Sequence, residues 1–129
     1  MTGSKDDLIR YRLSRSKDTF DDAKILADKE RWNSAINRLY YFAYYAVIAI
    51  LLKHDFKPTT HNGAKSLFSE HFIKNGIIPK KFGKLYSQLF TWRQKGDYDD
   101  LYDFDKDKVI PYFEPVKRLI EIIENKINE

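Results

Sequence analysis

The stretch over residues 31–54 is apolar on every side of the helix that it predicts. After Arg38 no charged residue occurs until Lys53, and residues 39–52 are all apolar or tyrosine. At about 1.5 Å of rise per residue, the whole stretch makes a helix of roughly 36 Å. A surface helix shows one apolar stripe, whereas a helix that is apolar all round is buried in a core, in a subunit interface or in a membrane.

A membrane span is the weakest of these three interpretations. A spanning helix needs about 20 apolar residues, and the apolar run over residues 39–52 is shorter. The run also contains tyrosines, whose hydroxyl groups need polar partners or water. These tyrosines are Tyr40, Tyr41, Tyr44 and Tyr45. We therefore expect a central helix that packs in its own bundle, presents some tyrosines to a partner subunit, and does not contact a membrane.

Apolar residues at helical spacing continue along the rest of the chain and predict further helices. These helices run over residues 5–29, from residue 61 to a stop at 75–76, over residues 79–96 and over residues 106–128. Thr60 is a suitable N-cap for the helix that begins at His61, and Gly76 can end that helix in a left-handed conformation. Pro111 and Pro115 predict a late start or a kink in the last helix.

The sequence shows no strand pattern, no internal repeat and no low-complexity segment. We therefore expect an all-α fold, an up-and-down bundle of four to five helices, in one domain over residues 1–129. The absence of cysteine excludes disulfides and thiolate chemistry. The first residues show no apolar signal-peptide core, so the expected location is the cytoplasm.

The net charge of +4 is unevenly distributed along the chain. Lysines and arginines dominate residues 53–95, where Asp55 and Glu70 are the only acids, and a run of aspartates follows from Asp97 to Asp107. A basic third is typical of a protein that binds polyanions, and a solvated lysine face is the alternative. The acidic segment over residues 97–107 also suits electrostatic pairing with a partner.

Familiar catalytic motifs are absent from the sequence. No P-loop, glycine-rich dinucleotide turn or nucleophile elbow occurs. His54, His61 and His71 lack the short helical spacing of metal ligands, so we expect them at the surface or at helix ends. We expect no metal and no cofactor.

Residues 91–100 hold the most promising group of polar side chains. Arg93 and Asp97 are four residues apart, so they share one face of a helix. An ordinary exposed ion pair of this kind contributes only roughly 0.3–0.5 kcal/mol. However, we expect Gly96 to end the helix, which would place a guanidinium, a carboxylate and the phenol of Tyr98 together at a helix end. A guanidinium is well suited to bind phosphate through two parallel hydrogen bonds.

Three blocks of the sequence, in this order, resemble the HEPN (higher eukaryotes and prokaryotes nucleotide-binding) domain family. They are NSAINRLYYFAYYAVIAILLKH, TTHNGAKSLFSEHFIKNG and RQKGDYDD. The resemblance is strongest to small stand-alone bacterial and archaeal members and covers residues 5–127. It implies a helical bundle that is usually a homodimer and is often encoded beside a minimal nucleotidyltransferase as a toxin–antitoxin pair.

The resemblance also implies a site. Active members are metal-independent RNases that use an arginine followed, after about four to six residues, by a histidine, in a cleft at the dimer interface. Arg93 matches that arginine, but no histidine follows, and Asp97 and Tyr98 occupy its region. Histidine exchanges protons near neutral pH, whereas tyrosine titrates near pH 10 and Asp97 would serve only as a base.

Loss of the histidine affects cleavage more than binding. The residues expected to bind RNA or nucleotide phosphate are Arg93, Lys95, Lys84, Arg38 and Asn37. The residues expected to line the cleft or the dimer face are Tyr40, Tyr41 and Tyr44.

Three hypotheses follow. The first is a homodimeric module that binds RNA or nucleotides as one half of a toxin–antitoxin pair, with a nucleotidyltransferase-type partner. The second is a ribonuclease in which Arg93 stabilises the charge of the transition state while Asp97 or Tyr98 replaces the histidine. The third is an interaction protein that dimerises through the tyrosine face and holds its partner by the acidic segment.

Overall fold

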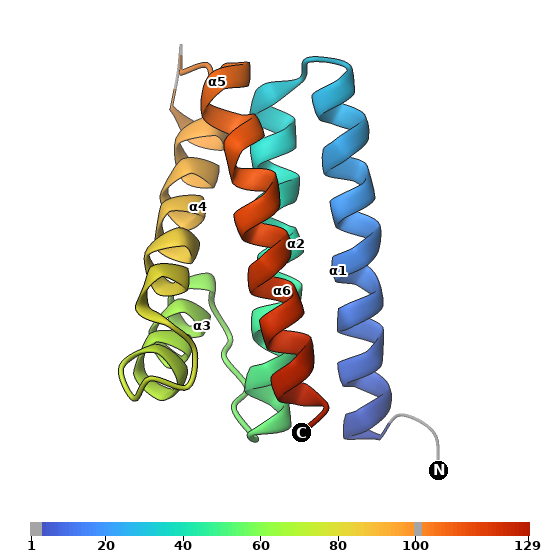
Figure 1. Ribbon diagram of the computed structural model, residues 1–129, viewed down its shortest axis with the longest axis vertical. Helices are drawn as coiled ribbons and strands as arrows, with labels where there is room; N and C mark the ends of the chain where they lie inside the picture. The colour runs from blue at the N-terminus through green and yellow to red at the C-terminus, as the bar shows by residue number, and fades with distance from the viewer. Residues whose placement is uncertain (1–3, 100–101) are drawn as a thin grey trace.

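The computed structural model describes residues 4–99 and 102–129, and this part of the chain is helical without strands (Figure 1). The α-helices are α1 (Lys5–Asp28), α2 (Trp32–Lys53), α3 (His61–Phe68), α4 (Lys80–Tyr98), α5 (Lys106–Val109) and α6 (Phe113–Ile127). A π-helical turn, Ser69–Ile73, extends α3, and a 3₁₀ turn, Ile110–Tyr112, joins α5 to α6. The predicted all-α bundle is confirmed.

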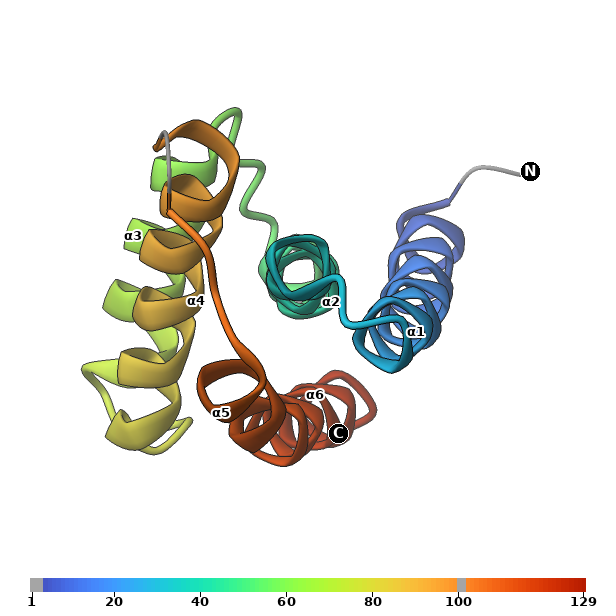
Figure 2. The same cartoon turned by 90° about the horizontal axis from the view of Figure 1, so that it is seen from above.

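Helix α2 is the centre of the bundle. Seen from above, α1, α6 and the α3–α4 pair surround it on three sides (Figure 2). Consecutive residues of a helix point in different directions, and Ala49, Ile50 and Leu51 are all fully buried. By length and composition α2 could cross a membrane, but 72% of its most apolar window is buried inside the bundle. Packing within the protein therefore accounts for most of its apolar surface.

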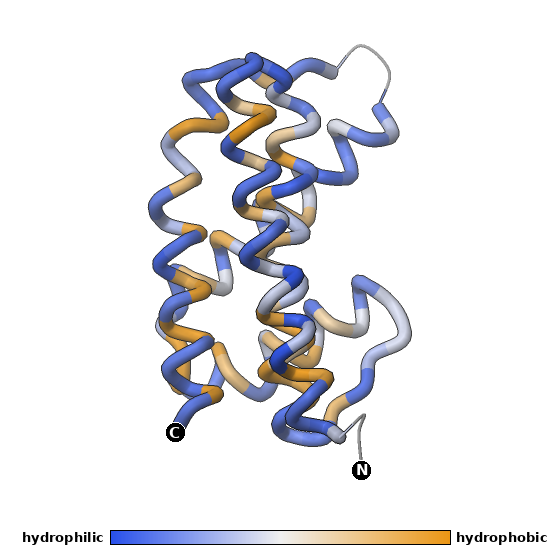
Figure 3. Tube along the Cα trace, turned by 90° about the vertical axis from the view of Figure 1, so that its right-hand side faces the viewer, coloured by the Kyte–Doolittle hydropathy of each residue, from blue (hydrophilic) through white to orange (hydrophobic). Residues whose placement is uncertain are grey.

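The helices around α2 bury one stripe each, and apolar and hydrophilic segments alternate along them (Figure 3). Helix α6 buries Val116, Leu119 and Ile123 against α2. Helix α1 places a polar residue, Ser16, in its buried stripe. The Ser16 hydroxyl donates a 2.6 Å hydrogen bond to the carbonyl of Phe42, which satisfies its polar group and ties α1 to α2.

Several predicted helix ends are confirmed by their capping geometry. The Thr60 hydroxyl accepts a 2.8 Å hydrogen bond from the amide of Gly63 at the start of α3. Gly76 follows the π-helical turn with a φ of 79°, a left-handed conformation that suits glycine. The predicted kink near Pro111 is the 3₁₀ turn between α5 and α6.

The prediction that Gly96 ends the fourth helix is wrong, because α4 continues to Tyr98. Gly96 instead allows close packing. A Cβ atom at this position would lie 3.2 Å from Cε2 of Phe104 and 3.9 Å from Cβ of Asn33. Asp97 and Tyr98 are therefore held on the last turn of a helix.

Asn33 fixes the acidic segment against the start of α2. Its Nδ2 donates to the carbonyl of Tyr102 at 2.9 Å, and its Oδ1 accepts from the amide of Phe104 at 2.8 Å. Residues 100 and 101 of this segment lie outside the described residues. These contacts hold the chain that follows α4 beside the N-terminal half of α2, where the polar side chains of α2 lie.

Candidate functional site

One stripe of α2 is not covered by the bundle. The unburied residues between Ser34 and Leu52 repeat at helical spacing and are polar or aromatic. They are Ser34, Asn37, Arg38, Tyr41, Tyr44 and Tyr45. Because residues three and four apart share a helix face, they form one continuous strip of α2, which we call the open stripe.

Arg93 reaches the open stripe from α4 and is buried, with 8% of its surface exposed. Its Cζ lies 5.1 Å from the ring centre of Tyr40, 5.8 Å from that of Tyr41 and 6.0 Å from that of Tyr98. These distances allow cation–π attraction to each ring. We call the space around this guanidinium the Arg93 cleft.

The Arg93 guanidinium is poorly matched by hydrogen-bond acceptors. Its Nη1 lies 3.8 Å from Oδ2 of Asp97, which is longer than a hydrogen bond. Its buried Nε has no hydrogen-bond partner among the described residues. Because buried polar groups are nearly always paired, an unpaired donor at this position is unusual.

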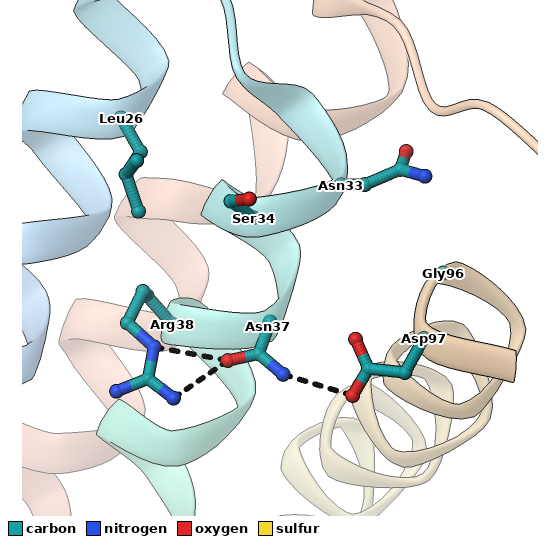
Figure 4. Close-up of a pocket in the computed structure, with 7 residues that line it drawn as sticks. All are labelled: Leu26, Asn33, Ser34, Asn37, Arg38, Gly96 and Asp97. Carbon is teal, nitrogen blue, oxygen red and sulfur yellow. Dashed lines mark hydrogen bonds between the residues drawn. The ribbon is translucent and has the colours of Figure 1, made fainter.

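Asn37 connects α2 to the end of α4 beside a pocket of about 330 Å³, whose lining includes Asn37, Arg38 and Asp97 but not Arg93 (Figure 4). Its Nδ2 donates to Oδ2 of Asp97 at 2.9 Å. Its Oδ1 accepts from Nε and Nη2 of Arg38 at 2.9 and 2.6 Å. The Arg38 guanidinium also lies 5.0 Å from the ring centre of Tyr41, so two arginines flank that ring.

His61 joins the same cluster from the first turn of α3. Its Nδ1 lies 2.7 Å from the hydroxyl of Tyr40, and its ring stacks on Tyr44 at 4.4 Å between centres. Burial raises the pKa of Tyr40 to about 12. Burial, followed by the charge of Arg93, lowers the pKa of His61 below its usual value. A neutral imidazole is therefore the stable form of His61 at neutral pH.

The sequence did not single out His61, which was grouped with surface or capping histidines. One signal was available. His61 directly follows the N-cap Thr60, so it is fixed at the start of a helix that packs on α2. Among the described residues, no group of three or more histidine, aspartate or glutamate side chains is placed to hold a metal ion.

The structure brings most of the predicted site residues together. Those in or beside the Arg93 cleft are Asn37, Arg38, Tyr40, Tyr41, Tyr44, Arg93, Asp97 and Tyr98. Lys95 lies elsewhere, because residues two apart on a helix point to different faces, and its Nζ lies 5.3 Å from the ring centre of Tyr102. Lys84 lines a separate groove between α3 and α4.

That second groove, of about 840 Å³, carries much of the basic charge. Its lysines are Lys65, Lys74, Lys80 and Lys84. Lys53, at the start of the basic third, has a structural role instead. Its Nζ donates to the carbonyls of Lys126 and Glu129, both at 3.2 Å, beside the end of α6.

Comparison with known proteins identifies the family to which this arrangement belongs. The model of the HEPN domain matches residues 9–126, so the chain belongs to the HEPN domain family. It is 34% identical to "UPF0332 protein" of Thermotoga maritima, over 97% of this chain and 95% of that protein. It is also 25% identical to "Putative toxin MJ0142" of Methanocaldococcus jannaschii, over 78% of this chain and 72% of that protein. The resemblance read from the three sequence blocks is confirmed.

Proposed function

We propose that this protein binds RNA or a nucleotide through a phosphate group in the Arg93 cleft. The observation that carries the proposal is the buried guanidinium of Arg93, whose Nε is unpaired among the described residues and whose nearest carboxylate is 3.8 Å away. Burying a charged group that lacks a full set of partners costs roughly several kcal/mol of folding free energy. Phosphate oxygens would supply both the negative charge and the missing acceptors.

The surroundings of Arg93 also suit a nucleic acid. Tyr98, on the last turn of α4, is 73% exposed. Unpaired bases stack on aromatic side chains of this kind. Arg38 brings a second guanidinium to the same face.

The basic groove between α3 and α4 adjoins the cleft through two aromatic contacts. Lys65, which lines the groove, has its Nζ 4.8 Å from the ring centre of Phe90. The Phe90 ring in turn lies 6.1 Å from that of Tyr40. The two sites are thus close together, and a single strand that reaches both would meet further lysines along the groove, whereas a mononucleotide would occupy only the cleft.

The biological setting that we propose is a toxin–antitoxin pair in the cytoplasm. Support comes from the relatives that are named putative toxins in Methanocaldococcus jannaschii. We further propose that the protein is a homodimer whose second copy lies against Tyr41, Tyr44 and Tyr45 of the open stripe, with a nucleotidyltransferase-type protein as its partner. Light scattering at micromolar concentration tests the dimer, and a monomeric mass would contradict it.

Binding is tested with a fluorescent single-stranded RNA 12-mer and with ATP, using wild type, Arg93→Gln and Arg118→Gln. Arg118 is exposed on α6, away from the cleft, and controls for the lost charge. Charge-assisted hydrogen bonds contribute roughly 1.5–3 kcal/mol, so Arg93→Gln should weaken binding by about 10- to 150-fold. Affinity should also fall steeply with salt. Equal affinities of Arg93→Gln and Arg118→Gln would contradict the proposal.

The same cleft supports a second function, metal-independent cleavage of RNA. Arg93 lies where a bound phosphate would develop negative charge in the transition state, and a fixed cation there lowers the barrier. Cleavage of an RNA in EDTA by wild type but not by Arg93→Gln is the test. The purely structural alternative, an interaction dimer, predicts neither binding nor cleavage.

A further inference from the structure

RNA cleavage requires a group that accepts a proton near neutral pH, and the residues closest to Arg93 are poorly suited to that role. Oδ2 of Asp97 already accepts a hydrogen bond from Asn37. The Tyr40 phenol keeps its proton, because burial raises its pKa to about 12. Tyr98 is an exposed phenol on the last turn of α4. A better-suited proton acceptor lies on another element.

His61 lies against the same two tyrosines as Arg93. Its ring centre lies 5.7 Å from those of both Tyr40 and Tyr41, while the Arg93 guanidinium lies 5.1 and 5.8 Å from them. Tyr40 is fully buried, so its hydroxyl is a fixed anchor for Nδ1 of His61. Stacking on Tyr44 fixes the plane of the imidazole.

We infer that His61 is the proton acceptor of the Arg93 cleft and makes it a metal-independent site for cleaving RNA at a 2′-hydroxyl group. This inference rests on the proposed binding of RNA phosphate by Arg93. It assigns the role to a residue of α3, some thirty positions before the arginine in the chain.

The reaction balances without a metal, an oxidant or a further reactant. When the Nδ1 proton is donated to the Tyr40 oxygen, Nε2 of His61 has a free lone pair. Nε2 takes the proton of the 2′-hydroxyl, and the 2′-oxygen attacks the adjacent phosphorus. The bond from phosphorus to the 5′-oxygen breaks, the leaving oxygen takes a proton from water, and His61 returns its proton to water. The products are a 2′,3′-cyclic phosphate and a 5′-hydroxyl, and Arg93 stabilises the charge on the other phosphate oxygens.

The charges around His61 favour the basic form. The titratable or charged groups that face it are Tyr40, Tyr41 and Tyr44 from α2 and Arg93 from α4. Burial and the Arg93 charge lower the pKa of His61, so most of the imidazole is neutral at pH 7. Cleavage should therefore rise with pH below the usual histidine range and level off near neutrality.

The test compares the full-length wild type with His61→Gln and His71→Gln in EDTA. His71 stacks on Phe56 at 4.3 Å, outside the cleft, and is the matched control. The cleavage substrate is a single-stranded RNA 12-mer. Its 2′-O-methyl version cannot attack phosphorus and therefore reports binding alone. We expect His61→Gln to reduce cleavage by about 10²- to 10⁴-fold while affinity for the methylated RNA stays within about twofold.

Two further measurements separate chemistry from structure. Added imidazole should restore part of the activity of His61→Gly and should leave wild type unchanged, which a merely structural histidine would not show. Thermal unfolding followed by the helical circular dichroism signal checks that His61→Gln and His61→Gly fold. Cleavage by His61→Gln at the wild-type rate would overturn the inference. Binding that depends on Arg93 without any cleavage by wild type would also overturn it and would leave the proposed binding function intact. Absence of Arg93-dependent binding would overturn both.

Discussion

Replacing Arg93 with methionine should leave the fold as stable as wild type or more stable, although the residue is buried. The variant loses the loose contact with Asp97, whose side chain is 29% exposed, and a partly exposed pair of this kind contributes about 0.2–1 kcal/mol. It also loses cation–π contacts to three tyrosine rings, each contributing roughly 0.5–1 kcal/mol. The loss is therefore roughly 2–4 kcal/mol.

The opposing contribution is the desolvation of the guanidinium. Keeping a charge in the protein interior costs roughly several kcal/mol of folding free energy. The Nε of Arg93 also lacks a hydrogen-bond partner among the described residues. Methionine has a similar length, and its sulfur makes favourable contacts with aromatic rings of about 0.3–1.5 kcal/mol. We expect the free energy of unfolding of Arg93→Met to exceed that of wild type by about 0–2 kcal/mol, as is common where stability is given up for function.

Urea unfolding followed by circular dichroism measures this difference. Thermal unfolding provides a second measure, since about 1 kcal/mol corresponds to roughly 3–4 °C in a chain of this length. Arg118→Met, on the exposed face of α6, should change stability by less than about 0.5 kcal/mol. A loss of more than about 2 kcal/mol in Arg93→Met would show that Arg93 is a structural residue, and would refute our reasoning that its charge awaits a ligand.

Three further predictions concern the rest of the molecule. Ser16→Ala removes a buried hydrogen bond to the Phe42 carbonyl and should lower the free energy of unfolding in urea by about 0.5–1.5 kcal/mol. The control Ser14→Ala, at an exposed position of α1, should have little effect. Equal free energies of unfolding for the two variants would contradict this role of Ser16. Gly83→Ala places a Cβ 2.9 Å from Cγ2 of Ile73. The cost of overpacking, about 1–3 kcal/mol, should exceed the gain in helix propensity, about 1 kcal/mol, so the variant should be less stable. A rise in melting temperature would contradict this. Wild type should lose stability relative to His61→Gln as pH falls below about 6.5. The pKa of His61 is lower in the folded protein than in the unfolded chain, so the unfolded chain binds more protons than the folded one in this range. Parallel pH profiles of the free energy of unfolding would contradict this.

The helices could be predicted from the sequence because their signals are local. Apolar spacing and the cap at Thr60 depend only on neighbours along the chain, and the structure places α3 where they indicate. Gly96 was misinterpreted because its reason lies in Phe104, a contact made only after folding. The π-helical turn before Gly76 likewise has no local signal, and its Ile73 packs tightly on Gly83 of α4.

The candidate site was predictable in part for the same reason. Arg93 and Asp97 share a helix, so their spacing indicated that they lie together. Their meeting with Asn37 could be suspected only from the family resemblance. The sequence places His61 at the start of a helix but gives no sign of the hydrogen bond to Tyr40 that joins two helices. Lys84 and Lys95 were grouped with Arg93 by charge, which does not specify the helix face.

The Arg93 cleft is assembled from three helices that are distant along the chain. Asn37 meets Asp97 across sixty residues, and Tyr40 meets His61 across twenty-one. During synthesis, the ribosome must therefore release α2, α3 and nearly all of α4 before the cleft can form. A chain that stops before α4, through a premature stop codon or early proteolysis, contains the tyrosines and His61 but no Arg93. Copies of this kind are thus without the site from the outset, and the cleft needs a chain that runs at least to the end of α4.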